Sequence, residues 1–112
     1  EITAGMRAPM FAAPMTGVSN LALMDAVTRA GVAGSFPVHN CASPAELGDW
    51  LSSLGSRDAE GLGPVIPNLV VHRTNKRQPH DLEVIAEHRV PAVITSVGSP
   101  ADVVPTLHDA GV

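Results

Sequence analysis

Short apolar runs alternate with amphipathic segments along this chain. The apolar runs predict four buried strands, at 10–14, 32–38, 64–71 and 90–98. The segments that follow them predict four helices, at Leu21–Ala30, Pro44–Gly55, Asp81–Arg89 and from Pro100 onward. Strands and helices in strict alternation favour a parallel sheet with right-handed crossovers, which is an α/β fold.

Two of the helices have similar start signals. In "SPAE" at 43–46, Ser43 can accept a hydrogen bond as N-cap, proline fits the first helical position, and Glu46 completes a capping box. "SPAD" at 99–102 predicts that Ser99 is a second N-cap of this kind. Pro105 disfavours helical geometry at the preceding residue, so we also expect a kink or a late start in the last helix.

The composition is that of one folded domain. Of the 112 residues, 45% are apolar and 16% charged, and we expect a single domain over 1–112 with no internal boundary. A net charge of −4 gives no general attraction to nucleic acid or to an anionic membrane, and no apolar run reaches the length that spans a bilayer. The single cysteine, Cys41, fits a reducing compartment, so we expect a cytoplasmic protein.

Ligands of parallel α/β proteins bind at the carboxyl ends of the strands, so these ends are where chemistry is expected. Pro14 lacks an N–H, and backbone groups beside it could be free to face a ligand; a simple strand-ending turn before Gly17 is the alternative. Asn68 places an amide within the apolar run "VIPNLVV". That amide suits a polar ring such as a flavin, or else satisfies neighbouring strand-end backbone groups.

Three further features of these strand ends bear on possible chemistry. His39 and Cys41 fall short of a structural zinc site, because no second Cys/His pair stands at suitable spacing. Cys41 as a nucleophile lacks a partner that the sequence can identify. The basic run "HRTNKR" at 72–77 fits either a solvated loop or a contact with an anionic substrate or cofactor tail.

Four segments in series resemble the amino-terminal half of the nitronate monooxygenase family, also called 2-nitropropane dioxygenases. They are "APMTGVSN", "GVAGSFP", "VIPNLVVHRTN" and "VPAVITSVGSP". The resemblance implies a flavoprotein with a (β/α)8 TIM barrel that holds FMN at the top of its strands. This chain would cover about the first four β/α units, as a half-barrel, and a fifth strand would begin near Val112.

The resemblance also implies site residues. Those expected to bind the FMN cofactor are Ala13, Pro14, Met15, Asn68, Thr95 and Ser96. The histidine that is catalytic in the family lies in its second half, beyond Val112, so no catalytic residue and no metal ligand is assigned in this chain. The groups that hold the FMN phosphate in the family also lie in that second half.

The implied enzyme is an oxidoreductase that oxidises small-molecule nitronates with O2 to a carbonyl compound and nitrite. A related FMN-dependent group, the NAD(P)H-dependent enoyl-acyl-carrier-protein reductases, shares this layout and stays open as an alternative. A third alternative is a non-catalytic half-barrel that self-associates into a homo-oligomer through its open sheet edges. The 112 residues alone are expected to be inactive, because the family's phosphate anchor and histidine are not among them.

Overall fold

The computed structural model describes residues 2–57 and 60–112. Its strands are β1 (Phe11–Ala12), β2 (Ala33–Pro37), β3 (Val65–Val70) and β4 (Ile94–Ser96). Its helices are α1 (Leu21–Arg29), α2 (Pro44–Gly55), α3 (Gln78–His88) and α4 (Val104–Asp109), with a short 3-10 turn, η1 (Val38–Asn40), after β2. The predicted alternation of strands and helices is confirmed.

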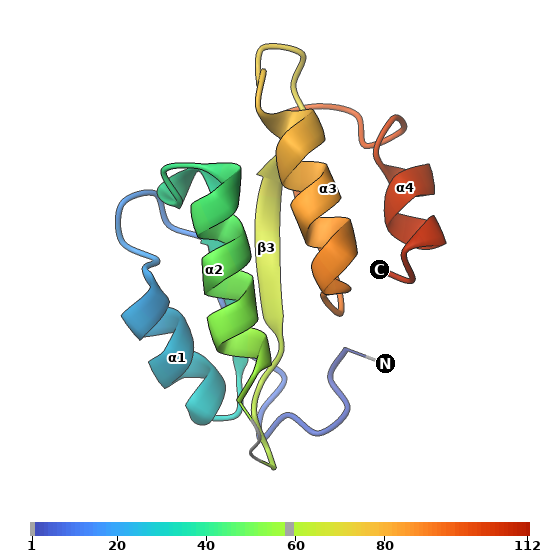
Figure 1. Ribbon diagram of the computed structural model, residues 1–112. Coiled ribbons are helices and arrows are strands. Elements are labelled where there is room, and N and C mark those ends of the chain that lie inside the picture. Colours follow the sequence, from blue (N-terminus) through green and yellow to red (C-terminus); the bar gives the residue numbers. More distant parts are fainter. Residues whose placement is uncertain (1, 58–59) are drawn as a thin grey trace.

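All four strands are parallel and lie in the order β1-β2-β3-β4. Each crossover therefore moves to the next strand in the same direction, which places every helix on one face of the sheet. Figure 1 shows α2 and α3 in front of β3, with α1 and α4 on either side. The sheet curls away from the helices into half of a barrel, compatible with part of a TIM-barrel-like fold.

The core lies between the sheet and the helices. Phe36 of β2 and Leu69 of β3 are fully buried there, against Met24 of α1, Leu47 of α2 and Ile85 of α3. The Phe36 ring lies 5.2 Å from that of Trp50, measured between centroids, in a tilted arrangement that aromatic pairs favour. Aliphatic side chains fill the rest of the core, as expected for a chain with 3% aromatic residues.

A partly exposed polar network fixes α1 to the end of α2. The Arg57 side chain donates to the Asp25 carboxylate at 2.9 Å, to the Thr28 hydroxyl at 2.7 Å and to the carbonyl oxygen of Leu54 at 2.8 Å. Arg29 donates to the other oxygen of Asp25 at 2.8 Å. The hydrogen bond from Arg29, aided by that from Arg57, lowers the pKa of Asp25 below its ordinary value. The carboxylate therefore stays ionised across the physiological pH range.

Several boundaries differ from those predicted. β1 and β4 are shorter than the apolar runs 10–14 and 90–98, and α3 begins three residues earlier than Asp81. The prediction that Ser99 caps the last helix is wrong, because α4 begins only at Val104, one residue before Pro105. The Ser99 hydroxyl instead accepts from the N–H of Ala101 in a local turn. The late start expected from Pro105 is confirmed.

None of the helices among the described residues is long and apolar enough to cross a membrane.

The predicted cap at Ser43 is present, and its removal is the first testable change. Ser43 Oγ accepts from the N–H of Glu46 at 3.1 Å, while the Glu46 carboxylate accepts from the N–H of Ala42. Ser43→Ala is expected to lower the free energy of unfolding by about 1 kcal/mol, because a first-turn N–H of α2 loses its acceptor.

Urea unfolding measures this loss. Ser53→Ala, which removes an exposed hydroxyl within the same helix, is the matched control and should change stability by less than about 0.5 kcal/mol. Equal stability of the Ser43→Ala and Ser53→Ala variants would contradict the assigned role of the cap.

Candidate functional site

The carboxyl ends of the four strands meet along one rim of the sheet, and alternation along each strand decides which side chains face away from the helices. A Cβ on Gly34 would lie 3.1 Å from Met24 Sδ, so Gly34 faces α1. Its neighbour in register, Val65, shares that face, and so does the buried Leu69. Asn68 and its partner Ile94 therefore face the concave side of the sheet.

Asn68 and Ser96 form a polar pair on that concave face. Ser96 Oγ donates to Asn68 Oδ1 at 3.1 Å, joining β3 to β4. Asn68 Nδ2 makes no hydrogen bond within residues 2–57 and 60–112. Asn68 is only half-buried, so this N–H group is available to a ligand. The alternative prediction, an amide that satisfies strand-end backbone groups, is not what these contacts show.

The loop between β1 and α1 is held by Asn40, which stands at the end of the second predicted strand and to which the sequence alone assigned no role. Asn40 Nδ2 donates to the carbonyl oxygens of Met15 and Ser19, each at 3.0 Å, and Asn40 Oδ1 accepts from the N–H of Gly17 at 3.0 Å. Ser19 Oγ accepts from the N–H of Met15 at 2.9 Å. The signal that could have found Asn40 is an amide directly after a strand, where it can reach the neighbouring loop.

For Met15, these bonds contradict the expectation that backbone groups beside Pro14 are free. The backbone N–H and C=O of Met15 are both paired within the chain, so they are not free to face a ligand. What the loop offers instead is apolar surface, because Ala13 is exposed and the Met15 side chain is 40% exposed. Gly17, at φ +71°, provides the left-handed residue on which the loop turns.

The backbone directly after Ser96 is strained. Val97 has φ +65°, which is unusual for a β-branched residue and costs roughly 1–3 kcal/mol. Its side chain is 67% exposed, so burial of that side chain does not explain the conformation. Strained residues concentrate at functional sites, and this one adjoins the pair of Asn68 and Ser96.

The predicted site residues do not all share this face. Ser96 and Asn68 are in direct contact, and Ala13, Pro14 and Met15 lie at the end of β1 on the same rim. Thr95 is in register with Leu69, so it points to the opposite face of the sheet. It lines a cavity of about 330 Å³ together with Val104 and Leu107 beneath α4.

Cys41 and His39 do not form a reactive pair or a metal site. The described residues contain no cluster of three or more His, Cys, Asp or Glu side chains that could hold a metal ion. Cys41 is fully buried, while His39 is exposed. Burial, together with the nearby charge of Glu46, raises the pKa of the Cys41 thiol to about 12. The thiol is therefore protonated at neutral pH and inert as a nucleophile.

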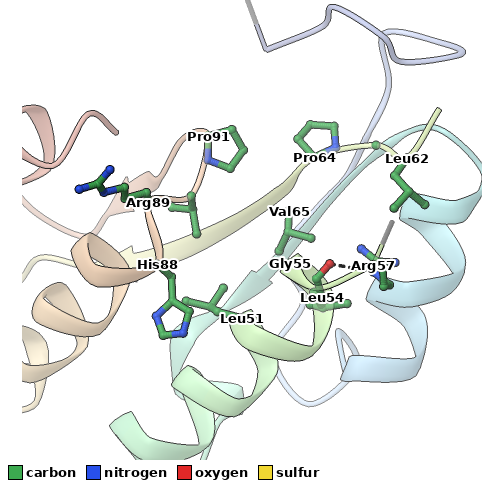
Figure 2. A pocket seen from close by; sticks show the side chains of 12 residues that line it. Leu51, Leu54, Gly55, Arg57, Leu62, Pro64, Val65, His88, Arg89 and Pro91 are labelled. Carbon is green, nitrogen blue, oxygen red and sulfur yellow. Dashed lines mark hydrogen bonds between the residues drawn. The ribbon is translucent and has the colours of Figure 1, made fainter. Parts of the chain in front are cut away.

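A second cavity, of about 360 Å³, lies at the opposite end of the strands, between the carboxyl-terminal ends of α2 and α3 (Figure 2). Two of its polar side chains, Arg57 and His88, are bonded within the fold. His88 Nδ1 lies 2.8 Å from the carbonyl oxygen of Val84, which can only accept, so Nδ1 carries the proton. His88 Nε2 then accepts from the Ser52 hydroxyl at 3.0 Å. At this end of the sheet, the bonds of Arg57 and His88 contribute to the stability of the fold.

Comparison with known protein families, curated proteins and solved structures finds no match to this chain. The candidate site therefore rests on its own geometry. It consists of a free amide donor on the concave face, the hydroxyl that orients it, strained backbone beside both, and an apolar loop at the end of β1.

The buried thiol gives a second prediction. At pH 8, Cys41 in the folded chain should react with a disulfide reagent at least about 100-fold more slowly than in urea, because its pKa of about 12 leaves little thiolate. The ordinary pKa of a cysteine thiol is 9.0, so the stability that the buried, protonated thiol contributes is fully present below pH 9 and is lost as the pH rises towards 12. Equal rates in the folded and the unfolded chain would contradict this environment for Cys41.

The contacts of Asn40 give a third prediction. Asn40→Asp keeps the acceptor for the N–H of Gly17 but removes the donor to Met15 and Ser19 and places a negative charge beside their carbonyl oxygens. The free energy of unfolding should fall by about 1–3 kcal/mol. Urea unfolding measures the change, with His39→Gln at the exposed neighbouring position as the control. If the two variants were equally stable, Asn40 would not hold the loop.

Proposed function

We propose that this chain supplies the amino-terminal half of an FMN-dependent oxidoreductase of the nitronate monooxygenase type. The observation that supports it most directly is the Asn68 amide, which keeps an unused N–H donor on the concave face while Ser96 fixes its orientation. The four segments that resemble this family follow one another in the family's order. The curled parallel sheet, with its helices on the outer face, is compatible with part of the barrel that such enzymes use.

The residues present fit a flavin ring. An isoalloxazine ring has apolar faces and polar atoms along its edge, so it needs an apolar support and a few well-placed donors. The exposed Ala13 and Met15 side chains supply apolar surface, and the loop that carries them is held by Asn40. Asn68 Nδ2 supplies a donor for an acceptor on the edge of the ring.

In this proposal each residue has a limited task. Asn68 binds and orients the ring edge, and the Ser96 hydroxyl keeps the amide in the orientation that directs Nδ2 outward. Bound FMN supplies the redox chemistry, in which the nitronate is oxidised, O2 is the terminal oxidant, and a carbonyl compound and nitrite are released. We assign no proton-transferring residue in this chain, because the family's histidine corresponds to a position beyond Val112. Thr95, which points to the other face, has no task in this proposal.

The test is the flavin content of the natural polypeptide that carries these residues. Asn68→Ala is expected to weaken FMN binding about 3- to 10-fold, the loss expected for one hydrogen bond. Ser96→Ala should weaken it less, because the amide remains but is no longer oriented. Both are measured by absorbance of the purified protein and by fluorescence titration with FMN.

Ser53→Ala, on the outer face of α2, is the control and should retain full flavin content. A colourless wild-type protein that does not bind FMN would overturn the proposal. Unchanged affinity in Asn68→Ala would overturn only the assignment of the amide. Release of nitrite from an alkyl nitronate distinguishes the proposed reaction from NAD(P)H oxidation.

A further inference from the structure

A third cavity, of about 310 Å³, opens between the loop after β3 and the loop after β4. The two loops are fixed against each other, because the N–H of Val71 donates to the carbonyl oxygen of Ser96 at 2.9 Å. A Cβ on Gly98 would lie 3.2 Å from the carbonyl oxygen of Val71, so the backbones are in close contact there. The cavity walls are thus held by the same strand ends that carry the candidate flavin site, but the cavity is a separate space.

The positive charges in this cavity are unpaired. Arg73 and Lys76 line it, and neither forms an ion pair with a described residue. Arg77, in the same basic run, is different. Its guanidinium donates to both carboxylate oxygens of the buried Asp81, at 2.9 and 3.1 Å, and to the carbonyl oxygen of Cys41 at 2.8 Å. The basic run therefore divides into a structural arginine and two cations available to a ligand.

The cavity also contains acceptors. Asp102 lines it, and its carboxylate has no ion-pair partner in the described part of the chain. Asn75 shapes the loop by donating from Nδ2 to the carbonyl oxygen of Val70 at 2.7 Å. Its Oδ1 is buried without a donor from the described residues. An anion alone would satisfy the cations but would leave the Asp102 carboxylate facing further negative charge.

We propose that this cavity binds a small phosphate monoester that carries a free hydroxyl group, such as a sugar phosphate. Arg73 and Lys76 pair with the phosphate, and the ester's hydroxyl donates to the Asp102 carboxylate. The inference rests on this cavity alone and does not depend on FMN binding.

The test uses the full chain and three probes at constant ionic strength: ribose 5-phosphate, inorganic phosphate and ribose. Isothermal titration and amide chemical-shift changes measure their affinities. Ribose 5-phosphate should bind at least about 5-fold more tightly than inorganic phosphate, and ribose should not bind at the same concentrations. The largest shifts are expected in residues 71–79 and 98–103.

Two variants and one control separate the roles. The double variant Arg73→Gln, Lys76→Gln should bind ribose 5-phosphate at least about 10-fold more weakly, because both cations that pair with the phosphate are lost. Asp102→Asn should increase the affinity for inorganic phosphate and abolish the preference for ribose 5-phosphate over inorganic phosphate. Arg89→Gln removes an exposed arginine at the opposite end of the sheet, next to the cavity of Figure 2, and should leave binding unchanged.

Three results would overturn the proposal. One is the absence of binding at millimolar ribose 5-phosphate in a folded chain. Another is inorganic phosphate binding as tightly as the ester, which would show an unspecific attraction to positive charge. The last is an equal loss of affinity in Arg89→Gln and in the double variant. None of these results bears on the flavin proposal, because that proposal is tested by the flavin content of the protein and by the FMN affinity of the Asn68→Ala variant.

Discussion

The structure depends on the sequential parallel pairing of its strands. Because β1, β2, β3 and β4 lie side by side in chain order, each right-handed crossover adds its helix to the same face. All four carboxyl ends then lie on one rim, and the other face of the sheet stays concave. At the opposite end of the strands, Gly63 lies so close to Val32 that a Cβ on Gly63 would come within 1.8 Å of the Val32 carbonyl oxygen. Only glycine permits this entry into β3.

Side-chain amides connect neighbouring units along the rim. Asn40 joins the turn after β2 to the loop after β1, and Asn68 joins β3 to Ser96 of β4. Asn75 holds the loop after β3 to the end of its own strand. Amides suit this task because each combines a donor and an acceptor in one rigid group. Asn40 uses both ends of its amide within the fold, whereas Asn68 and Asn75 each use one end. The unbonded Nδ2 of the half-buried Asn68 is what makes this residue a candidate for ligand binding.

The charged residues divide in the same way between structure and surface. Arg57 and Arg77 each bind a carboxylate and a backbone carbonyl, linking α1 to α2 and the start of α3 to the loop before α2. Buried or half-buried pairs of this kind fix geometry because an unpaired partner would be costly. Arg73 and Lys76 lack such partners among the described residues and line a cavity instead. The sequence does not reveal this difference, because Arg73, Lys76 and Arg77 all lie within five positions of one basic run.

The sequence by itself determined the order of the elements, the parallel sheet, the Ser43 cap and the late start at Pro105, because these follow from local periodicity and backbone chemistry. It also identified Asn68 as an unusual residue, since an amide in an apolar strand is visible locally. Only the tertiary structure decided what depends on distant neighbours. Strand register places Thr95 on the opposite face of the sheet from Asn68. Asn40 holds a loop that lies more than twenty residues away in the sequence. Ser99 accepts a hydrogen bond in a local turn instead of capping α4. These features depend on contacts between residues that are distant in the sequence, and only the tertiary packing determines which residues come into contact.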